Sequence, residues 1–224
     1  MHLPLCHQLR HFANQAQFHP RKYAIGLCKS ILKNGSIIYE NSPVMDVSKT
    51  DEIYSIKVKN HTVNSKYVIL ATRYPFINFP GFYFLKMYQS MSYCSSYEIS
   101  DNNVFEGMYI NAEQPTLSAR IANDNNRKIL LISGCNHKVG KEAGVSNPYL
   151  TLNTFAKSID PNAKLLSKWV TEDSISIDKL PYIGKFSSLM PNMYIATGFK
   201  KWGMTFSNIA SNIIVDEILD KKNI

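Results

Sequence analysis

The sequence predicts a mixed α+β fold, and three observations support this. Apolar residues recur at helical spacing after Pro20 and again in residues 148–159 and 205–214. Short segments rich in β-forming residues alternate with polar turns over most of the remaining chain. With 224 residues, 45% of them hydrophobic, the chain is long and apolar enough to bury a proper core.

The first part of the chain predicts one helix and a series of short strands. Residues 1–18 have no period and indicate a loop. Pro20 then begins a helix that ends at Asn34 and Gly35, where a left-handed residue is expected. Strands are predicted at residues 36–40, 44–48, 53–58, 62–63 and 67–71. The last of them is apolar without alternation, which is typical of a strand covered on both faces.

The middle of the chain predicts a sheet of its own. Residues 74–82 are rich in proline and aromatic side chains, which indicates a crossing between domains. Successive antiparallel strands are predicted at residues 84–96, 107–112, 117–122 and 128–133, followed by a helix at 148–159 and a strand at 164–172. We therefore expect an antiparallel lobe in this region.

The stretch most suggestive of a ligand site is a strand, a glycine turn and a helix near the carboxyl end. Residues 192–197 alternate as a strand, Gly198 and Gly203 bracket the turn, and Thr205 can cap the helix. Such a junction aims unpaired N–H groups and the positive end of a helix dipole at the turn, which suits an anionic or electron-rich group. Many α/β loops share this pattern and bind nothing.

Positive charge and an aromatic ring lie in the same turn. Lys200 and Lys201 precede the predicted helix, and their charge would favour negative charge on a cofactor ring. Trp202 can stack on such a ring, although a buried core tryptophan is the commoner use of this residue.

His137 and Lys138 form a second candidate, in a glycine-flanked loop after a predicted strand. A histidine can move a proton near neutral pH, and a lysine can hold a carboxylate or shift charge at a cofactor. An exposed loop with both side chains solvated explains the pattern equally well. His19, Asp173 and Asp178 are further candidates, for which helix-start packing and turn formation are the alternatives.

The pattern of charges behind the net charge of +8, and the lack of a targeting signal in the sequence, limit the classes of protein to consider. The lysines are dispersed and form no basic helix face, so we expect no nucleic acid as a partner. A surface suited to anionic small molecules, or solvated lysines without a role, explains the charge as well. No apolar run reaches the roughly eighteen residues of a membrane span. The start also lacks a signal-peptide core, so we expect a cytoplasmic protein without a membrane partner.

Two kinds of site have no counterpart in the sequence. The cysteines lack metal-ligand spacing, so we expect no metal and no disulfide but reduced core thiols at Cys6, Cys28, Cys94 and Cys135. There is neither a Gly-x-Gly-x-x-Gly after a strand nor a Walker-type loop. The pyrophosphate of a dinucleotide therefore has no standard cradle in this chain.

Several stretches together resemble FAD-dependent oxidoreductases of the D-amino-acid oxidase and glycine oxidase superfamily. They are residues 15–23, 35–41, 67–76, 134–140, 169–173, 180–184 and, most specifically, 196–205. The resemblance covers nearly the whole chain and is strongest to a branch in which this module often precedes a Rieske iron–sulfur domain. It implies an incomplete FAD-binding lobe at residues 1–75 and 176–224, with an antiparallel substrate-binding lobe at 76–175.

The resemblance also implies roles for individual residues. The backbone at Val44 would hold the adenine end of FAD, and Ala71 and Thr72 would line the cofactor path. Around the isoalloxazine ring it implies Gly198, Trp202, Gly203, Met204 and Thr205 as cofactor-binding residues. Lys201 would favour negative charge on the ring, and His137 and Lys138 would lie beside the substrate, which makes these three the candidate catalytic residues.

The chain departs from the family in ways that change the expected function. Family members begin with the strand, glycine-rich turn and helix that bind the pyrophosphate, whereas this sequence starts past them, and Arg73 stands where relatives have His or Gly. We expect a truncated oxidase of an amine or amino acid that binds FAD weakly or not at all. We also expect a homodimer through an exposed sheet edge. The alternatives are a non-catalytic remnant acting as an interaction module and, third, a nucleic-acid binder.

Overall fold

A computed structural model describes residues 14, 16–100, 105, 107–124 and 127–222. The chain divides into two compact units, one within residues 7–66 and the other formed mainly by residues 67–224. None of the described helices is long and apolar enough to cross a bilayer.

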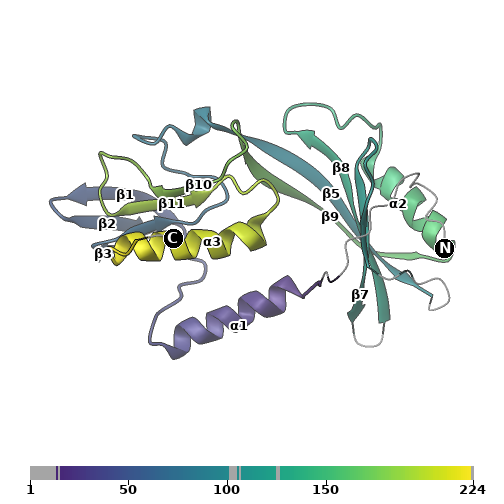
Figure 1. The fold of residues 1–224 in the computed structure, drawn as a ribbon, viewed down its shortest axis with the longest axis horizontal. Helices are drawn as coiled ribbons and strands as arrows, with labels where there is room; N and C mark the ends of the chain where they lie inside the picture. The colour runs from purple at the N-terminus through teal and green to yellow at the C-terminus, as the bar shows by residue number, and fades with distance from the viewer. Residues whose placement is uncertain (1–13, 15, 101–104, 106, 125–126, 223–224) are drawn as a thin grey trace. The chain divides into compact units, whose positions relative to one another are not determined.

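The unit within residues 7–66 holds one helix and a three-stranded meander (Figure 1). Helix α1 spans Pro20–Lys33, and the antiparallel strands are β1 (Val44–Thr50), β2 (Ile53–Val58) and β3 (His61–Ser65). The predicted helix is confirmed, including its end at Asn34 and Gly35, which has a φ of +81°. The strand predicted at residues 36–40 is wrong, because the chain leaves α1 through a turn and finds no strand partner there.

The second unit contains a small sheet with both parallel and antiparallel pairing. Strand β11 (Met193–Thr197) lies in the centre, antiparallel to β10 (Tyr182–Lys185) and parallel to β4 (Val68–Leu70). Helix α3 (Gly203–Ile218) packs along β10 and β11. The carboxyl ends of β4 and β11 therefore meet at one edge of this sheet, which is where open α/β sheets bind ligands.

A larger antiparallel sheet of five strands occupies the rest of this unit (Figure 1). Its order is β6 (Met108–Ile110), β7 (Leu117–Asp124), β8 (Arg127–Lys138), β5 (Met87–Ile99) and β9 (Lys164–Ser176). A short 3-10 helix, η1 (Tyr83–Leu85), precedes β5. The mixed α+β fold and the antiparallel middle lobe are thus confirmed in outline.

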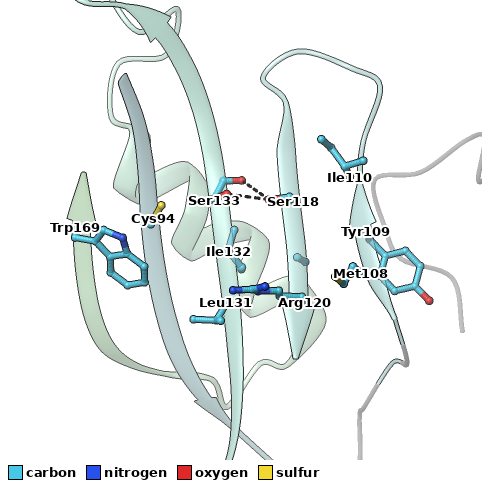
Figure 2. Close-up of a pocket in the computed structure, with 11 residues that line it drawn as sticks. Cys94, Met108, Tyr109, Ile110, Ser118, Arg120, Leu131, Ile132, Ser133 and Trp169 are labelled. Atoms are coloured by element: carbon cyan, nitrogen blue, oxygen red, sulfur yellow. Dashed lines mark hydrogen bonds between the residues drawn. The ribbon is translucent and has the colours of Figure 1, made fainter. Parts of the chain in front are cut away.

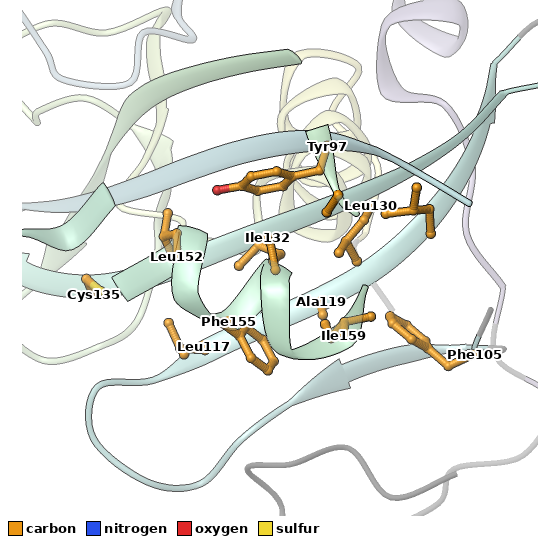
Figure 3. Packing of buried hydrophobic residues seen from close by; sticks show 13 residues of the cluster. Tyr97, Phe105, Leu117, Ala119, Leu130, Ile132, Cys135, Leu152, Phe155 and Ile159 are labelled. Atoms are coloured by element: carbon orange, nitrogen blue, oxygen red, sulfur yellow. The ribbon is translucent and has the colours of Figure 1, made fainter. Parts of the chain in front are cut away.

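Helix α2 (Pro148–Ile159) covers one face of the five-stranded sheet (Figure 3). Side chains from alternate strand positions pack under it, because successive residues of a strand point to opposite faces. The buried cluster comprises Tyr97, Ile99, Phe105, Leu117, Ala119, Leu130, Ile132, Cys135, Leu152, Phe155, Ala156, Ile159 and Ala163. The intervening residues, such as Leu131 and Ser133, face the other way, and we call that side the open face.

The predicted helix at 148–159 and strand at 53–58 match the structure, and most other elements shift by a few residues. Strands β8 and β9 continue to Lys138 and Ser176, past the predicted ends at 133 and 172, because they pair with the long strand β5. Strand β10 was not predicted. The division at residues 75/76 and 175/176 stays a prediction, as does the loop at 1–18, most of which lies outside the described residues.

The cysteines follow the prediction only in part. Cys94 and Cys135 are buried free thiols, and burial raises the pKa of each. Cys28 is exposed on α1, so a core position was wrong for it, because no side chain of this helix is buried. Cys6 lies outside the described residues.

Candidate functional site

A cavity of about 230 Å³ lies where β4 and β11 end. Ala71 and Thr72 follow β4, and Gly198 follows β11, so the parallel pairing brings these distant parts of the sequence together. Asp173 and Ser174 of β9 form a further wall. The cavity thus joins the small sheet to the end of the five-stranded sheet.

Hydrogen bonds to one carbonyl group hold these walls in place. The backbone oxygen of Arg73 accepts from the Thr197 hydroxyl at 2.7 Å and from the Ser174 hydroxyl at 2.6 Å. The Arg73 guanidinium lies against Glu172, with Nη2 3.3 Å from Oε2. The backbone of Arg73 therefore ties β4 to β11 and β9, while its side chain is engaged by another residue.

Thr72 has an unusual hydroxyl group in this wall. Its Oγ1 is buried and has no hydrogen-bond partner in the part of the chain that the structure describes. A buried hydroxyl without a partner costs about 1–3 kcal/mol, so such groups usually serve a ligand or a bound water. Thr72 is therefore the wall residue that points most directly to a ligand.

The turn after β11 is built from left-handed residues. Gly198, Lys200 and Lys201 have φ values of +74°, +46° and +69°. A Cβ at Gly198 would lie at ordinary van der Waals distance from the sulfur of Met87 (3.5 Å) and from Ser176 (3.6 Å), so the positive φ, and not a lack of space, favours glycine here. The predicted glycine turn is confirmed, and it delivers the chain directly to α3.

The first turn of α3 presents unpaired donors. The amides of Thr205 and Phe206 both donate to the carbonyl of Trp202, at 3.1 and 2.9 Å. Among the described residues the N–H groups of Gly203 and Met204 have no acceptor. Together with the helix dipole they form the electropositive end that the sequence indicated.

Two details of this junction differ from the prediction. Thr205 is not the cap, because α3 already begins at Gly203 and Trp202 occupies the N-cap without a side-chain hydrogen bond. Trp202 is 63% exposed, which rules out the buried-core alternative, and Met204 is 41% exposed. The predicted cofactor-binding residues Trp202, Gly203, Met204 and Thr205 are thus exposed or partly exposed, whereas Gly198 is buried.

Lys201 connects this turn to the open face of the five-stranded sheet. Its Nζ donates to the Ser92 hydroxyl at 2.8 Å. Desolvation lowers the pKa of Lys201, and the negative charges of Asp173 and of a Cys94 thiolate act against that shift. The residue as a whole remains exposed, whereas its ammonium group is partly desolvated and is held by Ser92.

The structure separates the two other predicted catalytic residues. Both lie in β8 and not in a loop, because a bulge at Cys135 (φ +53°) lets the strand continue. The His137 ring stacks on Tyr93 at 5.8 Å, on the α2 side. Lys138 pairs with Ser90 on the open face, and its Nζ lies 5.1 Å from the centroid of the Tyr88 ring. Lys138 therefore shares a face with Ser92 and Lys201, whereas His137 does not.

The remaining predicted residues belong to other elements of the fold. Val44 begins β1 in the unit within residues 7–66 and is 37% exposed. Asp173 belongs to β9 and not to a loop, whereas Asp178 does form a turn by accepting from the Leu180 amide at 3.1 Å. His19 is the N-cap of α1, accepting from the Lys22 amide at 3.4 Å.

Sequence reasoning missed the polar residues that the sheet brings to this site. Ser90, Ser92 and Ser96 alternate along β5 and are buried, and Ser174 and Thr197 tie the walls. The serines at positions 90, 92 and 96, which share one face of the strand, were the available signal, because such a pattern indicates a face that meets polar groups.

A family model described as FAD dependent oxidoreductase (DAO) matches residues 4–217. The chain belongs to this family. The Bacillus subtilis protein YhfW, which is named as a Rieske 2Fe-2S iron–sulfur protein, is 35% identical over 210 residues. That alignment covers 94% of this chain and 41% of YhfW, which fits the predicted resemblance to a Rieske-associated branch.

Solved structures of amino-acid oxidases and dehydrogenases share the fold of this DAO-family chain. Glycine oxidase from Geobacillus kaustophilus superimposes with a TM-score of 0.72 at 17% identity, covering 89% of this chain and 54% of that one. L-proline dehydrogenase from P. horikoshii gives 0.72 at 16% identity, covering 91% and 56%. The chain thus spans about half the length of these relatives, or less.

Proposed function

We propose that this DAO-family chain takes part in the FAD-dependent oxidation of a C–N bond in an amine or amino acid. The observation that carries the proposal is the cavity at the ends of β4 and β11. Its lining includes Thr72, whose hydroxyl has no partner among the described residues, and Gly203, the first residue of α3, whose amide has no acceptor among them. Family membership supports FAD as the cofactor. When bound, FAD supplies the acceptor for a hydride from a carbon next to nitrogen.

Two residues that line the cavity, Thr72 and Gly203, and two of the adjoining turn and helix, Lys201 and Met204, fit one part of this cofactor. Thr72, the amides of Gly203 and Met204, and the Lys201 ammonium are all hydrogen-bond donors, which suits the oxygen- and nitrogen-rich edge of a flavin ring. Trp202 offers an exposed aromatic surface beside them. A volume of about 230 Å³ is smaller than the roughly 300–1,000 Å³ of most ligand pockets, so it accommodates only a portion of FAD.

We further propose that the chain by itself holds FAD weakly. The sequence contains no Gly-x-Gly-x-x-Gly turn, so the pyrophosphate lacks the helix-terminus site that dinucleotide-binding folds provide. Lys201 would orient and stabilise the electron-rich ring edge, and Lys138 would lie on the substrate side. We propose no proton-transfer role for His137 in this site, since its ring packs on the α2 side of the sheet.

The test is a titration of the purified chain with FAD in which binding is measured by flavin fluorescence. Amines and amino acids are then added under anaerobic conditions. Saturable binding that Lys201→Met weakens, with bleaching of the flavin absorbance by at least one amine, is the expected result. Lys185→Met is the matched control, because Lys185 is an exposed lysine of β10 that does not line this cavity. FAD that does not bind at all, or that binds equally well to all variants, would contradict the proposed site.

A second candidate function is a non-catalytic interaction module. Strand β4 is the outer strand of its sheet in the described part of the chain, and Ile69 within it is 47% exposed. Such an edge can pair with another chain, and we propose a homodimer as the partner arrangement. The oligomeric state of the Ile69→Lys variant is measured by sedimentation. Ile177→Lys, which alters an exposed residue outside the strands, is the control, so a loss of the dimer in Ile69→Lys alone indicates edge pairing and not a general effect on solubility.

A further inference from the structure

Four large apolar side chains are exposed in the segment that leads into β5. Phe79, Phe82, Phe84 and Leu85 have exposed fractions of 65%, 41%, 41% and 64%. The three rings contact one another, with centroids between 5.0 and 6.4 Å apart. We call these four residues the apolar patch. A contiguous group of this kind indicates an interaction surface, whereas a single exposed ring does not.

The apolar patch is separate from the candidate ligand site. None of its residues lines the cavity at the ends of β4 and β11. A second cavity, of about 410 Å³, lies on the open face of the five-stranded sheet, and no residue of the patch lines it either (Figure 2). The patch therefore requires an explanation other than the binding of a small molecule in these cavities.

Tyr83, in the middle of the patch segment, fixes this segment to the small sheet. Its ring packs on Tyr182 and Phe186, at 5.6 and 5.2 Å between centroids. Its hydroxyl donates to the carbonyl of Phe186 at 2.9 Å. Phe82, the preceding residue, has a φ of +52°, a conformation that a bulky residue rarely adopts. The patch is thus exposed on a well-anchored segment, because Tyr83 and not its neighbours occupies the interior.

Positive charge lies beside the patch. The loop after β9 meets the patch segment, because the Ile177 amide donates to the Lys86 carbonyl at 2.9 Å. Residues 74–86 and 177–189 hold one acidic residue, Asp178, whose carboxylate already accepts an amide in a turn. The same two segments hold three exposed lysines, which are Lys86, Lys179 and Lys185. The surface beside the patch therefore carries a net positive charge.

These two properties together match the surface of an anionic lipid bilayer. Phenylalanine and leucine side chains have no hydrogen-bonding group, so they suit a partner that offers none, such as lipid acyl chains. The strongest contacts of protein interfaces are instead enriched in Trp, Tyr and Arg. Anionic headgroups at the level of the lysines would supply the complementary charge. The chemistry of the patch therefore favours lipid over a protein partner.

We propose that the apolar patch inserts into the interface of an anionic membrane, with the neighbouring lysines facing lipid phosphates. Such a contact requires no spanning helix, so it is compatible with the described helices, none of which could cross a bilayer. The expectation of no membrane partner rested on the lack of a spanning segment and does not bear on a surface contact. The contact also needs no flavin, so it is tested independently of the proposed function.

The test is sedimentation of the purified chain with lipid vesicles. One set of vesicles is phosphatidylcholine alone, and the other contains an equal amount of phosphatidylglycerol, which is anionic. We expect saturable binding to the anionic vesicles, at least about tenfold tighter than to the neutral ones, because each lysine near the surface adds a factor of about five. This preference should largely disappear in about 1 M salt, where the Debye length is about 3 Å.

Variants then assign the binding to the patch. Leu85→Ser and Phe79→Ser should each weaken binding to anionic vesicles about tenfold, because each removes an exposed apolar side chain from the contact. Leu150→Ser is the matched control and should bind like the parent protein, since Leu150 is 59% exposed on α2 and lies outside the patch. Lys179→Gln should weaken binding to anionic vesicles about fivefold and leave binding to neutral vesicles unchanged.

Three results would overturn the proposal. The first is an equal loss of binding in Leu85→Ser and Leu150→Ser, or no binding by protein with an unchanged circular dichroism spectrum. The second is anionic binding that neither Leu85→Ser nor Phe79→Ser weakens, because the net charge of +8 alone would then explain the attraction. The third comes from sedimentation without vesicles, where self-association that Leu85→Ser abolishes, together with no lipid binding, would assign the patch to contact with a second copy of the chain.

Discussion

The unpaired hydroxyl of Thr72 leads to a prediction with two opposite effects. Valine has nearly the shape of threonine and lacks the hydroxyl, so Thr72→Val should stabilise the free protein and weaken flavin binding. Few substitutions separate a ligand contact from a structural contact so directly. The hydroxyls of Thr72, Ser95 and Ser176 are all buried without a partner among the described residues, but of these three residues only Thr72 lines the cavity at β4 and β11.

The size of each effect follows from the burial of this atom. A buried hydroxyl without a partner costs about 1–3 kcal/mol, and since Thr72 is only partly buried we expect a gain near the lower figure, about 1 kcal/mol. For a chain of this size that gain raises Tm by about 2–4 °C. Loss of one hydrogen bond to a flavin should raise its Kd about fivefold to tenfold, which corresponds to about 1–1.4 kcal/mol.

Stability is measured by urea unfolding of the free protein, and affinity by quenching of flavin fluorescence. Ser95→Ala is the matched control, because the Ser95 hydroxyl is also buried without a partner but does not line the cavity at β4 and β11. Ser95→Ala should leave the flavin Kd unchanged. A Thr72→Val protein that is less stable, or that binds flavin as well as the parent protein, would refute the assignment of this hydroxyl to a ligand.

Three further predictions concern charge and packing. Asp173→Asn should lower the pKa of Lys201 further, as followed by NMR titration of labelled lysine. Desolvation already lowers the pKa of Lys201 in the folded protein, so the unfolded chain binds the lysine proton more tightly. The free energy of unfolding should therefore rise as the pH increases toward the ordinary pKa of lysine. Hydrogen bonds, first that from the Ser100 amide, lower the pKa of Asp160, so its contribution should disappear as the pH falls below about 4. Asp160→Asn should cost about 2 kcal/mol at neutral pH and flatten the acid limb of a pH series of urea unfolding curves. Leu130→Ala, at a position with 0% exposure in the core, should cost about 2–5 kcal/mol in the same assay, and a loss under about 1 kcal/mol would contradict the packing described.

Much of the fold could be predicted from local patterns. Pro20 and Pro148 each begin a helix, and the helical spacing after them is unambiguous, so both elements were placed correctly. Strand ends were less accurate, because the lengths of β8 and β9 depend on pairing with β5 and not on their own residues. The strand predicted at residues 36–40 failed for the same reason, since its sequence suits a strand but no strand of the described residues pairs with it.

The candidate site could be predicted only where neighbours in sequence are neighbours in space. The turn from Gly198 to Gly203 was found because its glycines, lysines and helix start are contiguous. Ser92 and Ser174 come from two different strands, and only the sheet register brings them to the site, whereas Asp173 was named in advance as a candidate but expected in a loop. His137 and Lys138 show the converse error, because adjacent residues of a strand point in opposite directions.

Strand β9 has a further consequence, because it sets the spacing between the two cavities. Trp169 lines the cavity of about 410 Å³ on the open face, and Asp173 lines the cavity at the ends of β4 and β11. The two residues are four positions apart on the same face of β9, or about 13 Å at the usual rise of a strand. The distance between the two cavities is therefore fixed by the backbone of a strand and not by a loop. Inserting one residue between Trp169 and Asp173 would turn one of the two side chains toward α2. Inserting two residues would keep both side chains on the open face and increase the distance between them by about 7 Å.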